Sequence, residues 1–276
     1  MKVSIITATY NSAATIASCM DSVLHQSYPN IEYIIMDGGS EDETMALIEQ
    51  TAKDYPQLIV KSEPDHGIYD ALNKGIAMAT GDVIGFVHSD DFFADTEVIA
   101  QIVKTFEDED AHGVYGNLHY VSFDNTDNIV RNWVSQPYHA SLLKKGWMPA
   151  HPTLFLKKDI YDTYGLFNMS YQIAADYDFI LRIFQQKDLK FVFLDQTIIK
   201  MRVGGASNGS LKNILQKTKE DLKALKRNNI GGFGTVLLKN ITKIKQFIPK
   251  SWGVMPIGIR YEGLGIRKFE IDLLRQ

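Results

Sequence analysis

The chain has 276 residues, of which 45% are apolar and 22% charged, and its formal net charge is −4. This length and composition suit one large α/β domain, or a domain with an appendage. No run of about eighteen uncharged apolar residues occurs and the N-terminus lacks a cleavable signal pattern, so we expect a cytoplasmic protein. Cys19 is the only cysteine, which excludes an intrachain disulfide and a thiolate zinc site. We expect Cys19 to be inert core.

The first hundred residues alternate between apolar runs rich in β-branched residues and segments with helical spacing. Such alternation predicts a parallel sheet with helices on both faces. The expected strands are 3–9, 31–36, 58–60 and 83–87, and the expected helices are 16–24, 41–55 and 71–79. Asn11 and Ser12 are expected to cap the first helix.

Ligands of such sheets bind beyond the carboxyl ends of the strands, so the polar loops there are the candidate site. These loops are Thr9–Asn11, Asp37–Ser40, Glu63–Gly67 and Ser89–Asp91. The last of them ends the apolar run Gly81–Val87 with two adjacent carboxylates, Asp90 and Asp91. One interpretation is that the pair caps a helix after Phe93. The other is that a divalent cation compensates their mutual repulsion.

Beyond residue 95 the alternation is less regular. We expect a helix through Ile99 to Phe106, then paired strands at 113–123 and 129–134 around a turn at 124–128. The remaining expectations are a helix at 138–146, a strand at 153–156, a helix at 174–185 and a strand at 191–201.

The last 66 residues differ in charge from the rest. Residues 211–276 carry 14 Lys and Arg against 5 Asp and Glu, which makes this tail about +9 and the preceding chain about −13. Residues 211–227 and 233–249 predict two basic amphipathic helices. Their apolar faces could pack on the rest of the chain, on a second subunit in a homodimer, or on an anionic membrane surface.

Several motifs occur in a recognisable order along the chain. They are Ser4–Asn11 (SIITATYN), Asp37–Thr44 (DGGSEDET), His66–Gly75 (HGIYDALNKG), Ala79–Asp82 (ATGD) and Ser89–Asp91 (SDD). Together they resemble the family 2 glycosyltransferases of the GT-A fold, most closely the bacterial O-antigen, capsule and exopolysaccharide type. The resemblance covers roughly residues 1–210. It implies a Rossmann-like, mostly parallel central sheet flanked by helices, followed by a C-terminal helical extension.

The resemblance implies a division of labour. Residues 1–95 would bind a nucleotide-sugar, in the first instance a UDP-sugar. Residues 96–210 would bind an acceptor, and residues 211–276 would form the basic extension. Asp37 would accept a hydrogen bond from the uracil ring. The full set of implied donor-binding residues is Thr7, Ala8, Thr9, Tyr10, Asn11, Asp37, Gly39, Ser40, Asp65, Gly67, Asn73, Lys74, Ser89 and Asp90. The alternative for Asp37 is a helix cap after Ser40.

In the same family the acidic pair contacts the donor ribose and binds Mn²⁺ or Mg²⁺. Asp91 would hold the metal and Asp90 would face the ribose. Ser89 stands where the fullest form of the motif has another acid, so we expect modest metal affinity without bound nucleotide. Such a cation neutralises charge on the departing diphosphate.

The family also places a general base at the start of a late helix, where this chain has Asp176. Ala175 replaces a first acid at that position. A carboxylate there can take the proton of an acceptor hydroxyl, and a single displacement inverts the anomeric centre. Asp178 lies about 200° further round the helix, so it has either a supporting role or a solvated position.

Four further residues are weaker candidates for the acceptor side. His151 could hydrogen bond the acceptor or the diphosphate, or be a structural hydrogen bonder. Trp147 and Tyr171 could stack on a sugar or be core. Arg202 could contact phosphate from a loop that closes over the donor.

The resulting interpretation is an inverting, metal-dependent glycosyltransferase acting on a saccharide or lipid-linked saccharide. The cytoplasmic protein could attach peripherally to the inner face of the membrane, and no nucleic acid is expected among its partners. Two alternatives are weighed against it. A sugar nucleotidyltransferase would need a basic glycine-rich loop after the first strand, where this chain has Thr9–Ser12. An inactive sugar-nucleotide binding or scaffold protein is disfavoured because Asp91 and Asp176 are both present.

Overall fold

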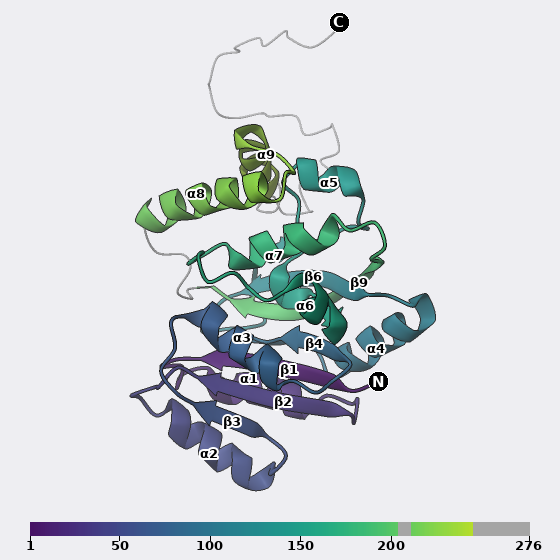
Figure 1. Cartoon of the computed structure of the whole chain (residues 1–276). Helices are drawn as coiled ribbons and strands as arrows, with labels where there is room; N and C mark the ends of the chain where they lie inside the picture. Colours follow the sequence, from purple (N-terminus) through teal and green to yellow (C-terminus); the bar gives the residue numbers. More distant parts are fainter. Residues whose placement is uncertain (204–210, 245–276) are drawn as a thin grey trace, which may run out of the picture.

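The fold is that of a computed structural model, which describes residues 1–203 and 211–244 (Figure 1). Its strands form one nine-stranded sheet in which neighbours follow the order β3-β2-β1-β4-β8-β6-β9-β5, with β7 paired to β6. In that order the strands are β3 (Ile59–Ser62), β2 (Ile31–Asp37), β1 (Val3–Thr9), β4 (Val83–Phe86), β8 (Phe155–Lys157), β6 (Gly113–Val121), β9 (Phe191–Arg202), β5 (Asp91–Phe93) and β7 (Ile129–Trp133).

The two halves of the sheet are built differently. β3, β2, β1 and β4 are parallel to one another, as the alternating pattern predicts. In the second half β6 and β9 are parallel, but β8 and β5 run antiparallel to their neighbours. The register places Thr9 opposite Asp37, and Asp37 opposite Ser62. The polar loops after the first three strands therefore start at the same edge of the sheet.

Helices cover both faces of the sheet because successive strand residues point to opposite sides. Ile5 packs in one apolar core and Ile6 in the other. The core of Ile5 is closed by α1 (Ile16–Leu24), α2 (Thr44–Asp54) and α4 (Val98–Glu109). The core of Ile6 is closed by α3 (Ile68–Met78), α5 (Ala140–Lys144), α6 (Lys158–Tyr164) and α7 (Ala175–Phe184). Cys19 is fully buried, and burial raises its pKa to about 12, as expected of inert core.

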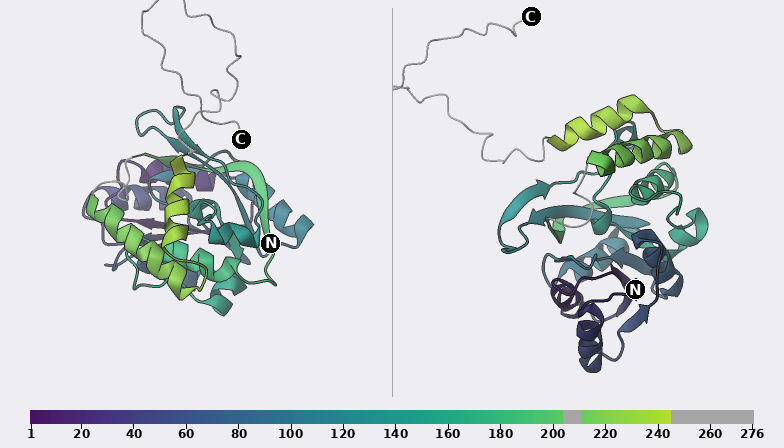
Figure 2. Two further views of the ribbon diagram at one scale, coloured as in Figure 1. Left: turned by 90° about the horizontal axis from the view of Figure 1, so that it is seen from above. Right: turned by 90° about the vertical axis from the view of Figure 1, so that its left-hand side faces the viewer.

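The basic tail begins with two helices, α8 (Leu211–Arg227) and α9 (Phe233–Ile244), which we call the C-terminal hairpin. Figures 1 and 2 place it beyond α7, on the side away from the first four strands. Ala224, Leu225 and Val236 join the same core as α7. The described part of the tail therefore packs its inward face on the rest of the chain. The expected helix at 233–249 extends beyond residue 244, outside the described residues. Among the described residues no helix is both long and apolar enough to cross a membrane.

Some expected elements differ from those observed. α3 begins at Ile68 rather than at residue 71, because Gly67 at φ 104° makes the turn into it. Of the strand expected at 153–156, Phe155 and Leu156 lie in β8, whereas Thr153 belongs to a 3-10 turn, η1 (His151–Thr153). The predicted side-chain cap of α1 is wrong, since the α1 N-cap is Thr15 and makes no side-chain cap bond.

Candidate active site

Asp37 organises the loops at the edge of the parallel strands. Its Oδ2 accepts hydrogen bonds from the backbone N–H groups of Gly39 (3.1 Å) and Ser40 (3.0 Å) and from the Ser62 hydroxyl (2.6 Å). Its Oδ1 accepts from the Ser40 hydroxyl at 2.5 Å. The helix-cap alternative for Asp37 is wrong, because α2 begins at Thr44 with Glu43 as its N-cap. Asp37 instead joins the loop after β2 to the end of β3.

The loop after β1 is held against the same network. The Asn11 backbone N–H donates to the Ser40 hydroxyl (2.8 Å). The Asn11 side-chain Oδ1 accepts a hydrogen bond from the Glu41 N–H (2.9 Å). Tyr10 is 59% exposed, whereas Thr9 is buried with a hydroxyl that has no partner among the described residues. The Tyr10 ring is therefore available to a ligand, whereas the Thr9 hydroxyl is enclosed.

Two of the expected donor-binding residues on β1 lie inside the sheet. Thr7 is fully buried, and its hydroxyl bonds the Val87 carbonyl oxygen (2.8 Å) and the Tyr33 hydroxyl (3.0 Å). Ala8 is also buried, in the core shared with α3. The structure therefore does not bring the Thr7 side chain to the loop edge.

Asp65 lies close to Gly38 because that residue has no side chain. A Cβ on Gly38 would lie 2.6 Å from Asp65 Oδ2. Asp65 Oδ1 accepts a hydrogen bond from the Gly67 N–H (2.8 Å), which supports the turn into α3. The loop after β3 is therefore packed against the loop after β2 at the same edge.

Asn73 and Lys74 on α3 have partners of their own. The Asn73 amide exchanges hydrogen bonds with the Phe167 backbone, donating at 2.9 Å and accepting at 3.0 Å. Lys74 forms ion pairs with Glu63 (3.1 Å) and Asp70 (3.2 Å). Asn73 thus anchors the segment before α7, and Lys74 lies at the side of the loop after β3.

The acidic pair lies between the end of β4 and the start of β5. The helix-cap alternative for Asp90 and Asp91 is wrong, because Asp91 is the first residue of β5 and α4 begins only at Val98. The pairing of β5 with β9 brings Arg202 alongside. The Arg202 guanidinium donates to the Asp90 carbonyl oxygen (2.8 Å), and its backbone N–H lies 3.3 Å from Asp91 Oδ1. The Ser89 hydroxyl bonds that of Ser12 (2.9 Å).

The environment of Asp91 fits a divalent cation. Asp91 is 1% exposed, and its Oδ2 has no hydrogen-bond partner among the described residues. Burial and the charge of Asp90 raise its pKa well above the ordinary value. A buried carboxylate oxygen without a partner is costly, and a hard cation with oxygen ligands would compensate it. Across residues 1–203 and 211–244, no group of three or more His, Cys, Asp or Glu side chains is arranged to hold a metal.

Asp176 lies in the first turn of α7 and is linked to the acidic pair through His88. Burial lowers the pKa of His88, and the charges of Asp90 and Asp176 oppose this shift. His88 Nδ1 has no partner in the described part of the chain. The Tyr69 hydroxyl lies 3.3 Å from Asp176 Oδ1, which also accepts from the Tyr177 N–H (2.7 Å). His88 is therefore within electrostatic range of both Asp90 and Asp176.

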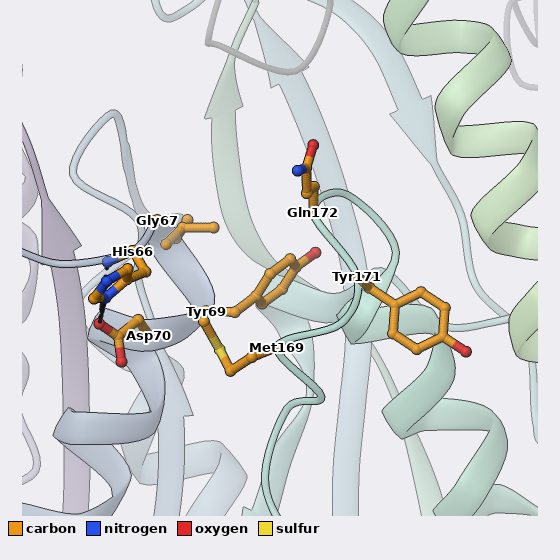
Figure 3. A pocket seen from close by; sticks show the side chains of 8 residues that line it. His66, Gly67, Tyr69, Asp70, Met169, Tyr171 and Gln172 are labelled. Carbon is orange, nitrogen blue, oxygen red and sulfur yellow. Dashed lines mark hydrogen bonds and ion pairs between the residues drawn. The ribbon is translucent and has the colours of Figure 1, made fainter.

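A pocket of about 610 Å³ opens between the start of α3 and the segment before α7 (Figure 3). Its lining combines apolar and aromatic surface with polar groups: His66, Gly67, Ile68, Tyr69, Asp70, Met169, Tyr171 and Gln172. In Figure 3 the Tyr69 ring lies between the His66–Asp70 pair and Tyr171. Since Tyr69 also contacts Asp176, the pocket adjoins the candidate base.

The structure packs two of the weaker acceptor candidates, His151 and Trp147, against aromatic rings of the core. His151 stacks on Phe86 with ring centroids 5.4 Å apart, and burial lowers its pKa to about 4. Trp147 packs in an aromatic cluster with Tyr115 and Phe184, which agrees with the core alternative.

The solvated alternative for Asp178 is wrong. Its side chain is fully buried and forms an ion pair with Arg182 (2.7 Å). It also accepts a hydrogen bond from Asn228 at the end of α8 (3.1 Å). Asp178 therefore faces the C-terminal hairpin, away from the side of α7 that carries Asp176.

Two residues of this region were not anticipated from the sequence. His88 directly precedes the Ser89–Asp91 motif, and this position was a signal that could have identified it. Tyr69 lies within the HGIYDALNKG motif, but only the packing of α3 against the segment before α7 reveals its contact with Asp176.

Comparison with known proteins identifies the class to which this fold and site belong. Residues 4–165 match the model of glycosyl transferase family 2, so the chain belongs to that family and is a glycosyltransferase of the GT-A fold. It is 31% identical over 212 residues to a "PGL/p-HBAD biosynthesis glycosyltransferase" of Mycobacterium bovis, covering 74% of this chain and 78% of the relative. It is also 27% identical to the chondroitin synthase of Pasteurella multocida, covering 89% of this chain but 25% of that protein.

Solved structures agree on the fold. S. aureus TarS 1–349 in complex with UDP-GlcNAc superposes with a TM-score of 0.66 at 17% identity, covering 83% of this chain. This chain spans 65% of that structure. The mannosyltransferase PcManGT of Pyrobaculum calidifontis, in complex with GDP-Man and Mn²⁺, superposes with a TM-score of 0.61 at 18% identity. That match covers 89% of this chain and 69% of the other.

Proposed function

We propose that this glycosyltransferase transfers a sugar, with inversion and with a divalent metal, from a UDP-sugar to a saccharide or lipid-linked saccharide in cell-surface polysaccharide synthesis. The observation that carries the proposal is the buried Asp91 carboxylate. One of its oxygens lacks a partner among the described residues, and His88 joins this region electrostatically to Asp176. In such an arrangement Asp91 would serve the diphosphate and Asp176 the acceptor hydroxyl.

The donor would lie across the loops after β1, β2 and β3, within residues 1–95. Asp37 would accept a hydrogen bond from the uracil ring in addition to those it receives from its own loop. The exposed Tyr10 ring would contact the nucleoside. The UDP-GlcNAc bound to TarS supports a uridine donor by analogy of fold.

Asp91 would hold the metal, with Asp90 toward the ribose. A bound Mn²⁺ or Mg²⁺ neutralises negative charge on the diphosphate. Arg202 bonds the Asp91 carboxylate through its backbone N–H and the Asp90 carbonyl oxygen through its guanidinium, whose positive charge would face the leaving group. The metal in the PcManGT complex supports this assignment by analogy.

Asp176 would be the general base, within the acceptor-binding half at 96–210. Its carboxylate takes the proton of an acceptor hydroxyl as that oxygen forms a bond to the anomeric carbon. The bond between the anomeric carbon and the diphosphate oxygen breaks on the opposite face, so the anomeric configuration inverts. Tyr69 lies close to Asp176 Oδ1 and orients that carboxylate.

The pocket beside Tyr69 would take the acceptor saccharide. Aromatic rings pack well on the apolar faces of sugars, and polar side chains at the rim can bond sugar hydroxyls. Tyr69 and Met169 supply the first kind of surface, and Asp70 and Gln172 the second. The names of two relatives, a PGL/p-HBAD biosynthesis glycosyltransferase and a chondroitin synthase, support a saccharide-containing acceptor by analogy.

The C-terminal hairpin offers a surface for a lipid-linked acceptor to reach the site. Ile214, Leu215, Phe233 and Leu237 are between 52% and 71% exposed. Lysines accompany them on α8, and such a combination suits attachment to the anionic inner face of the cell membrane. A homodimer through residues 211–276 is the competing use of the same surface.

The proposal is tested with purified protein and a panel of nucleotide-sugars in the presence of Mn²⁺. We expect UDP-sugars to raise the unfolding temperature more than GDP-sugars do, because a ligand of the folded state stabilises it. The preferred donor is then used for transfer to a saccharide acceptor, and NMR gives the anomeric configuration of the product. Retention of configuration, or unchanged turnover in excess EDTA, would contradict the mechanism.

A further inference from the structure

The C-terminal hairpin touches the helix that carries Asp176. Glu220 of α8 accepts hydrogen bonds from three consecutive backbone N–H groups, those of Gln172 (3.1 Å), Ile173 (2.8 Å) and Ala174 (2.9 Å). These groups precede α7 directly, and Ala174 is its N-cap. A carboxylate from a distant helix thus serves the start of α7, where no side-chain cap of its own is present.

The charge of Glu220 suits this position. Helix N-termini carry a partial positive charge, so an anion there is stabilised and orders the first turn. Burial alone would raise the pKa of Glu220, but the bonds from Ile173, Gln216, Gln172 and Ala174 outweigh it and bring the pKa below its ordinary value. Glu220 therefore acts as a fixed anion.

The same short segment is held from its other side by Tyr69 of α3. The Tyr69 hydroxyl donates to the Ile173 carbonyl oxygen (2.7 Å) and lies 3.3 Å from Asp176 Oδ1. Ile173 is thus held at its N–H by Glu220 and at its carbonyl by Tyr69. Asp176 is three residues further on, so any displacement of this peptide moves its carboxylate.

One further contact ties the two helices of the hairpin together, and another fastens the hairpin to α7. Lys239 of α9 forms an ion pair with Asp221 of α8 (2.8 Å), and both side chains are almost fully buried. The Lys239 ammonium nitrogen lies 3.2 Å from the centre of the Tyr177 ring. Burial lowers the pKa of Lys239, although the negative charges of Asp221 and Asp176 act to raise it. The hairpin that carries Glu220 is therefore also packed against Tyr177, the residue that follows Asp176.

From these contacts we infer that the C-terminal hairpin is part of the catalytic machinery, and that Glu220 is a positioning residue that holds the start of α7 so that Asp176 meets the acceptor hydroxyl. The inference rests on the proposed role of Asp176 as the base. It gives the extension a function apart from attachment to a surface, because the contact lies on its inward face.

The test compares Glu220→Ala, Glu220→Gln and the matched control Lys219→Ala, which changes an exposed neighbour on the same helix. We expect Glu220→Ala to lower kcat at least tenfold with the donor KM within about twofold of the wild type. Glu220→Gln keeps one carbonyl acceptor, so its kcat should lie between those of the wild type and Glu220→Ala. The kcat of Lys219→Ala should match that of the wild type. Amide hydrogen exchange at Ile173 and Ala174 should accelerate in the order wild type, Glu220→Gln, Glu220→Ala.

If Glu220→Ala does not fold, the isosteric variant Glu220→Gln provides the comparison with Lys219→Ala. The inference is overturned if kcat of the folded Glu220 variants equals that of Lys219→Ala, or if the loss falls on the donor KM. Asp176→Asn is measured alongside to separate the base role of Asp176 from the positioning role of Glu220. If Asp176→Asn is inactive while the Glu220 variants keep their kcat, the positioning inference alone fails. If Asp176→Asn is fully active, the base assignment fails.

Discussion

The two halves of the molecule hold their candidate site residues in different ways. In the first half Asp37 is bonded by Gly39, Ser40 and Ser62, all within about 25 positions along the chain. In the second half Asp176 is flanked by Tyr69, more than 100 residues earlier, and its segment is held by Glu220, more than 40 residues later. The proposed donor-binding loops are therefore supported by neighbouring residues in the sequence, whereas the proposed base depends on distant elements. Mutations in the two halves should separate donor binding from turnover.

The largest expected effect is at Asp91, where the two halves meet. Asp91→Asn should lower turnover at least about 100-fold and abolish the dependence of UDP binding on Mn²⁺, because a neutral amide is a weaker ligand than a carboxylate. The same change should raise the unfolding temperature of the metal-free protein, since it removes a buried charge beside Asp90. Steady-state kinetics, calorimetry and thermal unfolding measure these effects.

The exposed Asp54→Asn on α2 serves as the control and should leave all three quantities unchanged. A variant Asp91→Asn that is less stable than the wild type without metal would show that the carboxylate is structural. That result would remove the observation on which the proposed site depends.

The next largest expected effect is on the folding stability of the first half, through Glu32. Glu32 accepts hydrogen bonds from Lys2, Ser4 and Thr80 and so joins β1, β2 and the turn before β4. Burial opposes its ionisation, but these bonds prevail and lower its pKa to about 2. Because the folded-state pKa is depressed, this stability is complete above about pH 4.5 and is lost as the pH falls toward 2.

Glu32→Gln should therefore reduce the free energy of unfolding at pH 7 by about 2 kcal/mol, with the difference shrinking below pH 4.5. Urea unfolding at several pH values measures it. The exposed Glu49→Gln on α2 should change stability by less than about 0.5 kcal/mol. A difference for Glu32→Gln that stays constant from pH 7 to pH 3 would contradict the ionic account.

The smallest of these effects is expected at Asp37 and bears on donor binding alone. Asp37→Asn should raise the donor KM about tenfold. The substitution replaces one carboxylate oxygen, which accepts hydrogen bonds from the loop and in the proposal from the uracil ring, with an NH2 group that donates. The value of kcat should stay within about threefold of the wild type. Ser62→Ala removes a single bond to Asp37 and should raise the KM less. A fall in kcat at unchanged KM would show that the halves are not separable at this residue.

The parts of the fold that depend on local pattern could be predicted from the sequence. The alternation of strands and helices in the first half, the loops at their carboxyl ends and the acidic pair all follow from short-range periodicity. The start of α3 could not be placed, because it depends on the positive φ of Gly67. The strand expected at 153–156 was too long, since a 3-10 turn with Pro152 occupies its beginning.

The second half of the site depends on contacts that periodicity does not encode. Asp178 could have been solvated, and only its contacts with Arg182 and Asn228 show that it is buried. Nothing near Glu220 in the sequence indicates that it serves the start of another helix. Trp147 likewise could stack on a sugar by composition, but the packing of Tyr115 and Phe184 places it in the core.

The proposed role of Asp176 as the base is tested most directly by measuring donor binding and turnover on the same preparations of wild type and Asp176→Asn. The affinity for UDP with Mn²⁺ should stay within about twofold of the wild type, while turnover falls by about 10²–10⁴-fold, the usual contribution of a general base. Turnover equal to that of the wild type, or a loss of donor affinity as large as the loss of turnover, would contradict the division between a donor-binding half and a half that supplies the base.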